Sequence, residues 1–208
     1  MSRKILLIGG GGHCKSVLDS LLYYDNISEI GIIDQKQNVG KEIIGISIIG
    51  CDKDIPRLFT KGYNEAFVTL GNSKQRSMFF QTISKIGFEM PIITDKSAIV
   101  SENVKLGSGS FIGKRAIVNA GSCIGKGAIV NSGAIVEHDC IIGDFAHVSP
   151  GTVLCGGVEI GEDTHVGANS VIRQQLKIGS GTTIGMGSVV VENIRNNVVA
   201  YGNPCKVV

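Results

Sequence analysis

The feature that most constrains the fold is a six-residue repeat through the second half of the chain. An aliphatic residue recurs at every sixth position, sixteen times without a slip. A small residue usually stands two positions earlier, and Gly often follows. Such fixed-period self-similarity is typical of a parallel β-helix, in which each hexad forms one short strand and its aliphatic side chain points into a narrow prism. The aliphatic residues are Val100, Leu106, Ile112, Val118, Ile124, Val130, Val136, Ile142, Val148, Leu154, Ile160, Val166, Ile172, Ile178, Ile184 and Val190.

The first part of the chain has a different pattern. Apolar runs that predict buried strands (residues 4–9, 29–34 and 65–70) alternate with segments of helical spacing (residues 16–24 and 76–88). In the first helical segment one face consists of Val17, Leu18, Leu21 and Leu22. This alternation predicts a parallel α/β, Rossmann-like domain over residues 1–88. The β-helix with a short C-terminal tail would then occupy residues 89–208.

Composition excludes several classes of function. The 208 residues include 20 basic and 18 acidic side chains, a balance that does not indicate binding to nucleic acid or to an anionic membrane. No apolar stretch approaches the ~18 residues of a membrane-spanning helix, and the apolar N-terminal run is interpreted as a strand rather than a signal peptide. The six Cys residues show no CxxC pair, which favours reduced thiols and a cytoplasmic protein.

The hexads, the Gly-rich α/β domain, the segment EHDCIIGDFAHVSPG (residues 137–151) and the tail GNPCK (residues 202–206) carry a family resemblance. The chain resembles the hexapeptide-repeat sugar acetyltransferases of the sialic acid O-acetyltransferase type. Among these it is similar to the bacterial nucleotide-linked 4-amino-sugar N-acetyltransferases. The resemblance implies a left-handed β-helix with three hexads per coil. It also implies a homotrimer that binds acetyl-CoA between neighbouring β-helices and needs no metal.

The most informative polar position in the repeats is His138. With three hexads per coil, residues eighteen apart stack about 4.8 Å from each other, so the neighbours of His138 are Ala120 and Gly156. These small residues leave space beside the imidazole. Acyl transfer to an amine needs a general base, and a carboxylate on the second ring nitrogen orients such a histidine. The resemblance implies that His138 is the base and Asp139 its partner, with Glu137 as the alternative. A surface histidine without a catalytic role remains the other interpretation.

The resemblance also implies a surface for acetyl-CoA. The histidine that corresponds to His147 contacts this co-substrate in related enzymes, and the pantetheine arm runs along small residues. The matching positions are Gly156, Ala168, Gly185, Met186 and Gly187. A zinc site formed by His138, His147 and His165 is an alternative, but it would require ligands from different subunits to converge at about 2.0–2.1 Å. No metal is expected.

A glycine-rich loop, IGGGGHCKS, follows the first strand and opens a helix. The N–H groups of such a loop can face an anion. The dinucleotide fingerprint GxGxxG is incomplete because position 14 is Cys. The resemblance implies that the nucleotide sugar is bound by Gly11, Gly12, His13, Asp34, Gly71 and Asn72. A turn that only packs a helix on a sheet would explain the glycines equally well, but it would not explain His13.

These inferences predict an enzyme that transfers acetyl directly from acetyl-CoA to the amine of a UDP- or GDP-linked 4-amino-deoxy sugar, for a surface glycan. The α/β domain would hold the nucleotide and present the sugar to His138 of a neighbouring subunit. O-acetylation of a sialic acid or a related sugar is a second enzymatic possibility. A non-catalytic scaffold that binds nucleotide sugars is a third.

Overall fold

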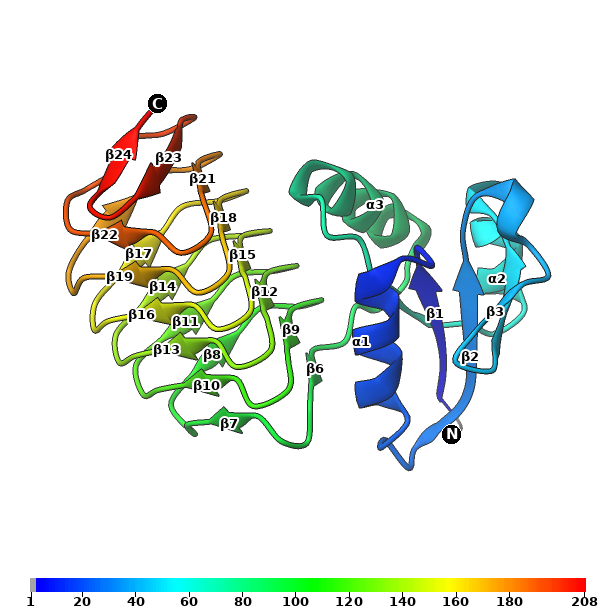
Figure 1. Cartoon of the computed structure of the whole chain (residues 1–208). Helices are drawn as coiled ribbons and strands as arrows, with labels where there is room; N and C mark the ends of the chain where they lie inside the picture. Colours follow the sequence, from blue (N-terminus) through cyan, green and yellow to red (C-terminus); the bar gives the residue numbers. More distant parts are fainter. Residues whose placement is uncertain (1–2) are drawn as a thin grey trace. The chain divides into compact units, whose positions relative to one another are not determined.

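The computed structural model describes residues 3–208 (Figure 1). They form two compact units, one ending at Ile93 and the other comprising Thr94–Val208. None of the helices in residues 3–208 has both the length and the apolar character to cross a membrane.

The N-terminal unit is built on a five-stranded sheet with the order β3-β4-β2-β1-β5. Strands β1, β2, β4 and β5 run parallel, while β3 pairs antiparallel with β4. The carboxyl-terminal parts of β1 and β2, residues 5–8 and 31–33, are buried because helices cover a parallel sheet on both faces. The strands are β1 (Arg3–Ile8), β2 (Ile27–Ile33), β3 (Glu42–Ile43), β4 (Ile46–Gly50) and β5 (Glu65–Val68).

Three helices accompany this sheet: α1 (Gly12–Leu21), α2 (Ile55–Thr60) and α3 (Ser73–Ile86), with short 3₁₀ turns η1 (Lys36–Asn38) and η2 (Asp52–Asp54). The predicted apolar face of α1 is confirmed for Val17, Leu18 and Leu21, which are buried. The prediction is wrong for Leu22, which is 53% exposed because it follows the last helical residue as the C-cap. Helix α3 ends at Ile86 and is followed by the C-cap Gly87, whose φ of 107° glycine adopts without strain.

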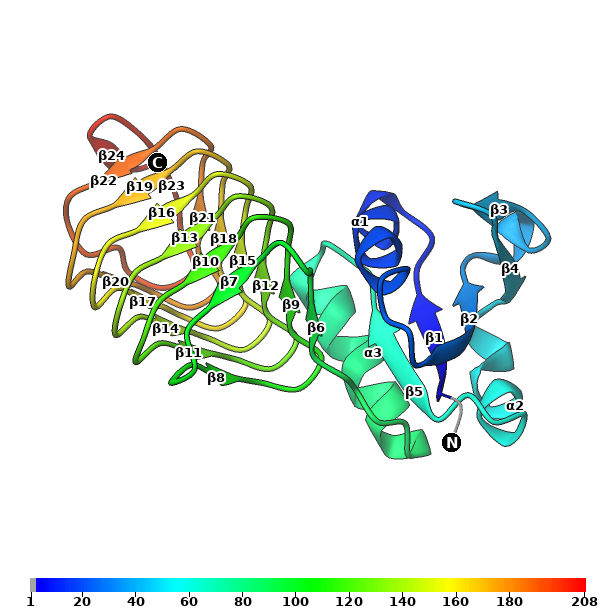
Figure 2. The same ribbon diagram turned by 90° about the horizontal axis from the view of Figure 1, so that it is seen from below.

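The C-terminal unit is a parallel β-helix with three faces, and in Figure 2 corresponding strands of successive coils lie next to one another. The first face comprises β6 (Ile93–Thr94), β9 (Phe111–Ile112), β12 (Ile129–Val130), β15 (His147–Val148), β18 (His165–Val166), β21 (Thr183–Ile184), β23 (Val199–Gly202) and β24 (Cys205–Val207). The second face comprises β7 (Ile99–Val100), β10 (Ile117–Val118), β13 (Ile135–Val136), β16 (Val153–Leu154), β19 (Val171–Ile172) and β22 (Val189–Val190). The third face comprises β8 (Lys105–Leu106), β11 (Cys123–Ile124), β14 (Ile141–Ile142), β17 (Glu159–Ile160) and β20 (Lys177–Ile178).

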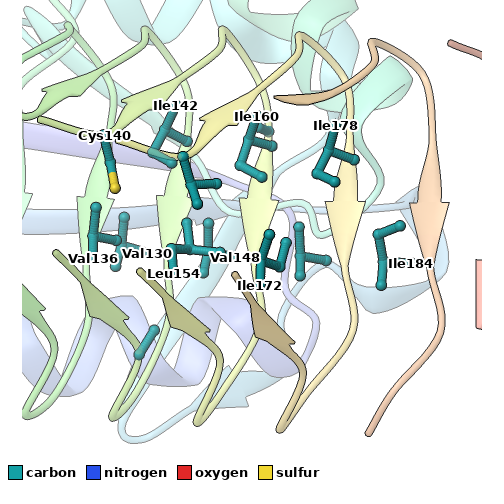
Figure 3. Close-up of a cluster of buried hydrophobic side chains, with 14 of the residues drawn as sticks. Val130, Val136, Cys140, Ile142, Val148, Leu154, Ile160, Ile172, Ile178 and Ile184 are labelled. Carbon is teal, nitrogen blue, oxygen red and sulfur yellow. The ribbon is translucent and has the colours of Figure 1, made fainter. Parts of the chain in front are cut away.

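The register between coils confirms the predicted stacking of residues eighteen positions apart. For example, Ile117 pairs with Ile135, and Ile135 pairs with Val153. The repeated aliphatic residues fill the interior as predicted, and those from Ile112 to Val190 are at most 3% exposed (Figure 3). The small residues two positions earlier, from Ser110 to Ser188, are buried beside them in the closely packed interior.

Candidate active site

His138 lies at a corner of the β-helix, in the turn of residues 137–140 between β13 and β14. The turn requires a left-handed backbone at Asp139, where φ is 61°. Asp is one of the few residues other than glycine that adopt this conformation readily. The corner therefore projects His138 and Asp139 outward from the coil, whereas Val136 and Cys140 on either side of them are buried.

The two side chains contact each other directly. His138 Nδ1 lies 2.8 Å from Asp139 Oδ2, although both side chains are well exposed, at 65% and 71%. Because a carboxylate only accepts hydrogen bonds, this contact assigns the proton to Nδ1 and leaves the lone pair on Nε2. The short Asp139 side chain thus reaches the ring, and this contact favours Asp139 over Glu137 as the partner of His138. Glu137 instead forms hydrogen bonds through its backbone, with its N–H donating to Leu154 O and its carbonyl accepting from Ser122 Oγ.

Glycines above and below make room for this pair. A Cβ atom built on Gly156 would lie 2.6 Å from both Cε1 and Nε2 of His138, so the imidazole occupies the space that a side chain would fill. One coil below, a Cβ atom on Gly121 would collide with Asp139 Oδ1. Gly156 thus lies beside the imidazole, as predicted, and the ring fills the room that this glycine leaves. The ring lies against the backbone of Gly156 with Nε2 on that side.

His147 is placed on the outer surface of the first face, on β15. Its Nε2 lies 3.1 Å from Asn131 Nδ2, and its ring meets that of His165 edge to face with centroids 4.9 Å apart. His165 Nε2 is 3.2 Å from Ser149 Oγ. Residues 3–208 contain no group of three or more His, Cys, Asp or Glu side chains placed to hold a metal ion.

The remaining residues predicted to line the pantetheine arm of acetyl-CoA lie at a different corner, between the first and second faces. They are Ala168, Gly185, Met186 and Gly187. Gly187 N–H donates to Ala168 O at 2.8 Å, which stacks the two turns, and Met186 projects into solvent with 81% of its surface exposed. A Cβ on Gly185 would lie 2.6 Å from Tyr201 Cβ, so this glycine admits the aromatic residue of β23. Within one chain the strands of the second face separate this corner from His138.

The N-terminal unit contains a pocket of about 220 Å³ at the carboxyl ends of β1 and β2. It is lined by Ile8, Gly9, Ile33, Asp34, Gln35, Asp52, Leu70, Gln75 and Phe79. Of the predicted substrate-binding residues, Asp34 lines it. Asp34 accepts hydrogen bonds from Gly10 N–H at 2.8 Å and Gln35 N–H at 2.5 Å, so its carboxylate holds the glycine loop against β2. Ligands of open α/β sheets bind at this edge, beyond the carboxyl ends of the strands.

The glycine loop leaves the start of α1 open. Gly11 is the N-cap of α1 and provides no side-chain hydrogen bond, and a Cβ on Gly11 or Gly12 would meet no atom within 4 Å. The first N–H groups of the helix are therefore accessible to an anion. Burial, followed by the nearby Arg76 cation, lowers the pKa of His13 to about 4, so this imidazole is neutral at physiological pH.

The turn after β5 is organised by side chains within the unit. Asn72 caps α3, and its Oδ1 accepts from Gln75 N–H at 3.0 Å. Gly71 O and Leu70 O each accept a hydrogen bond from Arg76 Nη1, at 2.9 Å and 2.8 Å. The contacts of Gly71 and Asn72 thus shape the loop between β5 and α3.

Several residues of the N-terminal pocket and of the His138 turn were not predicted from the sequence. Gln75 and Phe79 line the pocket from α3, and Arg76 holds its loop while only 1% exposed. The positions of Gln75, Arg76 and Phe79 shortly after the N-cap Asn72 could have indicated this, because the first turns of a helix face the loop that precedes it. Gly121 was also missed, although a glycine stacked one coil below the turn of His138 indicates close packing.

Comparisons with known proteins agree with this architecture. The family described as the PglD N-terminal domain matches residues 4–83, and the bacterial transferase hexapeptide family matches residues 139–174 and 157–192. No curated protein matches the chain significantly in sequence.

Solved structures provide closer matches. The chain is similar to perosamine N-acetyltransferase from Caulobacter crescentus in complex with CoA and GDP-perosamine, with 33% identity over 99% of this chain and 96% of that one and a TM-score of 0.95. It is also similar to the acetyltransferase domain of PglB from Neisseria gonorrhoeae in complex with acetyl coenzyme A, with 34% identity, complete coverage of both chains and a TM-score of 0.94. WeeI from Acinetobacter baumannii, at 24% identity over both full chains and a TM-score of 0.89, shares the fold.

The α/β unit and the left-handed β-helix of hexapeptide repeats define an acyltransferase of the hexapeptide-repeat class. The identity to the full-length solved structures narrows this class. The chain belongs to the hexapeptide-repeat sugar acetyltransferase family whose members carry a PglD-type N-terminal domain. The resemblance and the fold class predicted from sequence are confirmed.

Proposed function

We propose that this protein transfers the acetyl group of acetyl-CoA to the amine of a nucleotide-linked 4-amino-deoxy sugar, for the synthesis of a surface glycan. Two solved structures that match nearly the whole chain support this: perosamine N-acetyltransferase with CoA and GDP-perosamine, and the acetyltransferase domain of PglB with acetyl coenzyme A. The observation that carries the proposal is the His138–Asp139 pair, which leaves Nε2 as a proton acceptor beside Gly156. The six free cysteines fit a reducing compartment, so we place the reaction in the cytoplasm.

The proposed chemistry is direct transfer. The neutral sugar amine attacks the thioester carbonyl, His138 Nε2 removes the proton that the nitrogen must lose, and the C–S bond breaks to release the CoA thiolate. Asp139 holds the imidazole in the tautomer with the proton on Nδ1 and stabilises the imidazolium that forms. A nucleophilic Ser or Cys is not needed.

The nucleotide is proposed to bind in the N-terminal pocket. Asp34 and the open N-terminus of α1 support this assignment, since the helix end offers N–H groups to a diphosphate and the carboxylate can accept from a hydroxyl or an N–H group. The pocket does not distinguish UDP from GDP. We place O-acetylation of a sialic acid second, because the similar perosamine N-acetyltransferase was solved with GDP-perosamine, a nucleotide-linked amino sugar.

We also propose that the protein is a homotrimer. The predicted acetyl-CoA residues lie at two corners that one chain keeps apart, and a groove between two β-helices would use one corner from each. The outward positions of the second face form an aliphatic stripe, which could pack against a neighbouring copy: Ile99, Ile117, Ile135, Val153, Val171 and Val189. Ile99 and Val171 are 63% and 40% exposed in the single chain. A stripe of this kind on a soluble protein indicates an interface.

A charge in this stripe tests the assembly. Val153→Asp is expected to yield a monomer without transferase activity, measured by sedimentation and by product formation, because a buried carboxylate is costly. Lys177→Asp, on the third face beside Glu159, is the matched surface control and should stay trimeric. A fully active monomer would refute the trimer.

The reaction itself is tested by incubating the protein with acetyl-CoA and a panel of UDP- and GDP-linked 4-amino sugars and free sialic acids. Products are identified by mass spectrometry, with His138→Ala in parallel. Acetylation of one nucleotide amino sugar, reduced roughly 10²–10⁴-fold in the variant, is the expected result. Acetylated sialic acid alone would favour the O-acetyltransferase. Binding of nucleotide sugars without any product, unchanged in His138→Ala, would favour the scaffold.

A further inference from the structure

A single buried hydroxyl group closes the corner that carries His138. Ser122, one coil below, is fully buried, and its Oγ donates to Glu137 O at 2.8 Å while accepting from Cys140 N–H at 3.1 Å. These two groups are the first carbonyl and the last N–H of the turn of residues 137–140. One side chain thus ties both ends of the turn together.

The same arrangement occurs elsewhere, but the fold does not require it. Thr164 closes the corner of residues 179–182, donating to Gly179 O at 2.7 Å and accepting from Thr182 N–H at 3.3 Å. Other corners form with no hydroxyl beneath them, because the residue in the equivalent position is alanine. These alanines, all fully buried, are Ala116, Ala128, Ala134 and Ala146. A corner can therefore close without the hydroxyl, and its presence under His138 calls for another explanation.

The turn of His138 must also hold a specific contact between two of its side chains. Asp139 must keep its left-handed φ of 61° for its carboxylate to reach His138 Nδ1. Its N–H donates to Ala120 O at 3.1 Å, and His138 O accepts from Gly157 N–H at 2.9 Å. These bonds fix the middle of the turn, while the bonds of Ser122 fix its two ends. Both side chains of the pair are exposed, so surrounding side chains cannot hold them in place.

We propose that Ser122 is a positioning residue for catalysis: it holds the turn of residues 137–140 so that Asp139 meets His138 Nδ1 and Nε2 faces the substrate. This inference rests on the proposed role of His138 as general base. Ser122 does not touch a substrate, so it acts on kcat through the geometry of the pair. A catalytic group displaced by about 1 Å can lose on the order of a hundredfold in rate.

The test compares Ser122→Ala, which removes the hydroxyl, with Ser122→Thr, which keeps it. Thr makes the corresponding bond at positions 152, 164 and 182, so the substitution suits this position. In the steady-state acetylation assay we expect Ser122→Ala to lower kcat roughly ten- to a hundredfold, with the KM values of acetyl-CoA and the sugar changed less than twofold. Ser122→Thr should recover kcat to within about threefold of the wild type.

Thr164→Val is the matched control, since it removes a hydroxyl from an equivalent corner that carries no predicted site residue. It should keep its kcat while its thermal midpoint falls about as much as that of Ser122→Ala. An equal loss of kcat in Thr164→Val, a Ser122→Ala enzyme with normal kcat, or a Ser122→Thr enzyme as slow as Ser122→Ala would overturn the positioning role. Full activity in His138→Ala would instead refute the proposed base, which separates the two failures.

Discussion

Replacing Gly156 with alanine tests the geometry of the proposed base most directly. The new Cβ would lie 2.6 Å from Cε1 and Nε2 of His138, about 0.8 Å closer than the 3.4 Å at which ordinary van der Waals contact begins. The backbone of Gly156 lies outside the left-handed region, so alanine is compatible with the local fold. The strain therefore falls on the imidazole, which must tilt or move away.

A movement of this size matters because the ring is held by one hydrogen bond, from Nδ1 to Asp139 at 2.8 Å. If the ring moves by about 1 Å, this bond weakens and Nε2 leaves the position from which it accepts the proton. We expect kcat of Gly156→Ala to fall on the order of a hundredfold. The thermal midpoint should change little, since His138 is exposed and can rotate into solvent.

A double-mutant cycle identifies the cause. Acetylation rates are measured for the wild type, Gly156→Ala, His138→Ala and the double variant. If the methyl group acts through the ring, it has no further effect once the ring is removed. A persistent loss in the His138→Ala background, together with a raised KM for acetyl-CoA, would show that Gly156 acts through the predicted pantetheine contact instead. Activity of Gly156→Ala within twofold of the wild type would refute the reasoning.

Three further predictions concern the acid partner of His138, the loop after β5 and the pH dependence of stability. Asp139→Asn should lower kcat at least tenfold, because the amide no longer fixes the tautomer, whereas Glu137→Gln should change it less than threefold; steady-state kinetics compares them. Arg76→Met removes the hydrogen-bond donor of two partly buried carbonyls and should lower the free energy of unfolding by about 1–3 kcal/mol in urea titrations. The pKa of His13 falls from 6.5 to about 4 on folding, so the unfolded state binds more protons and stability drops as the pH falls through this window. His13→Gln should reduce that drop, measured by unfolding at pH 7 and pH 5; an unchanged pH dependence would contradict it.

The sequence by itself determined the architecture of the C-terminal unit. A six-residue period admits few structures, and each inward aliphatic residue lies where the period predicts, as Val136 and Leu154 illustrate. Because stacking follows from the period and the number of hexads per coil, it also predicted that Gly156 lies beside His138. The alternation of apolar runs and helical segments predicted the N-terminal unit in the same way, through local patterns that depend on near neighbours.

Only the tertiary structure decided which groups meet. The sequence places Glu137 and Asp139 on either side of His138, and the backbone at the corner brings Asp139 to Nδ1. From the sequence, Ser122 is one more small residue of the repeat. Only the stacking of the coils brings its hydroxyl group into hydrogen bonds with both ends of the turn above. Such contacts depend on backbone conformation at single positions and on residues fifteen or more apart in the chain. A repeat pattern specifies where a side chain stacks, but its partners follow from the conformation of each corner.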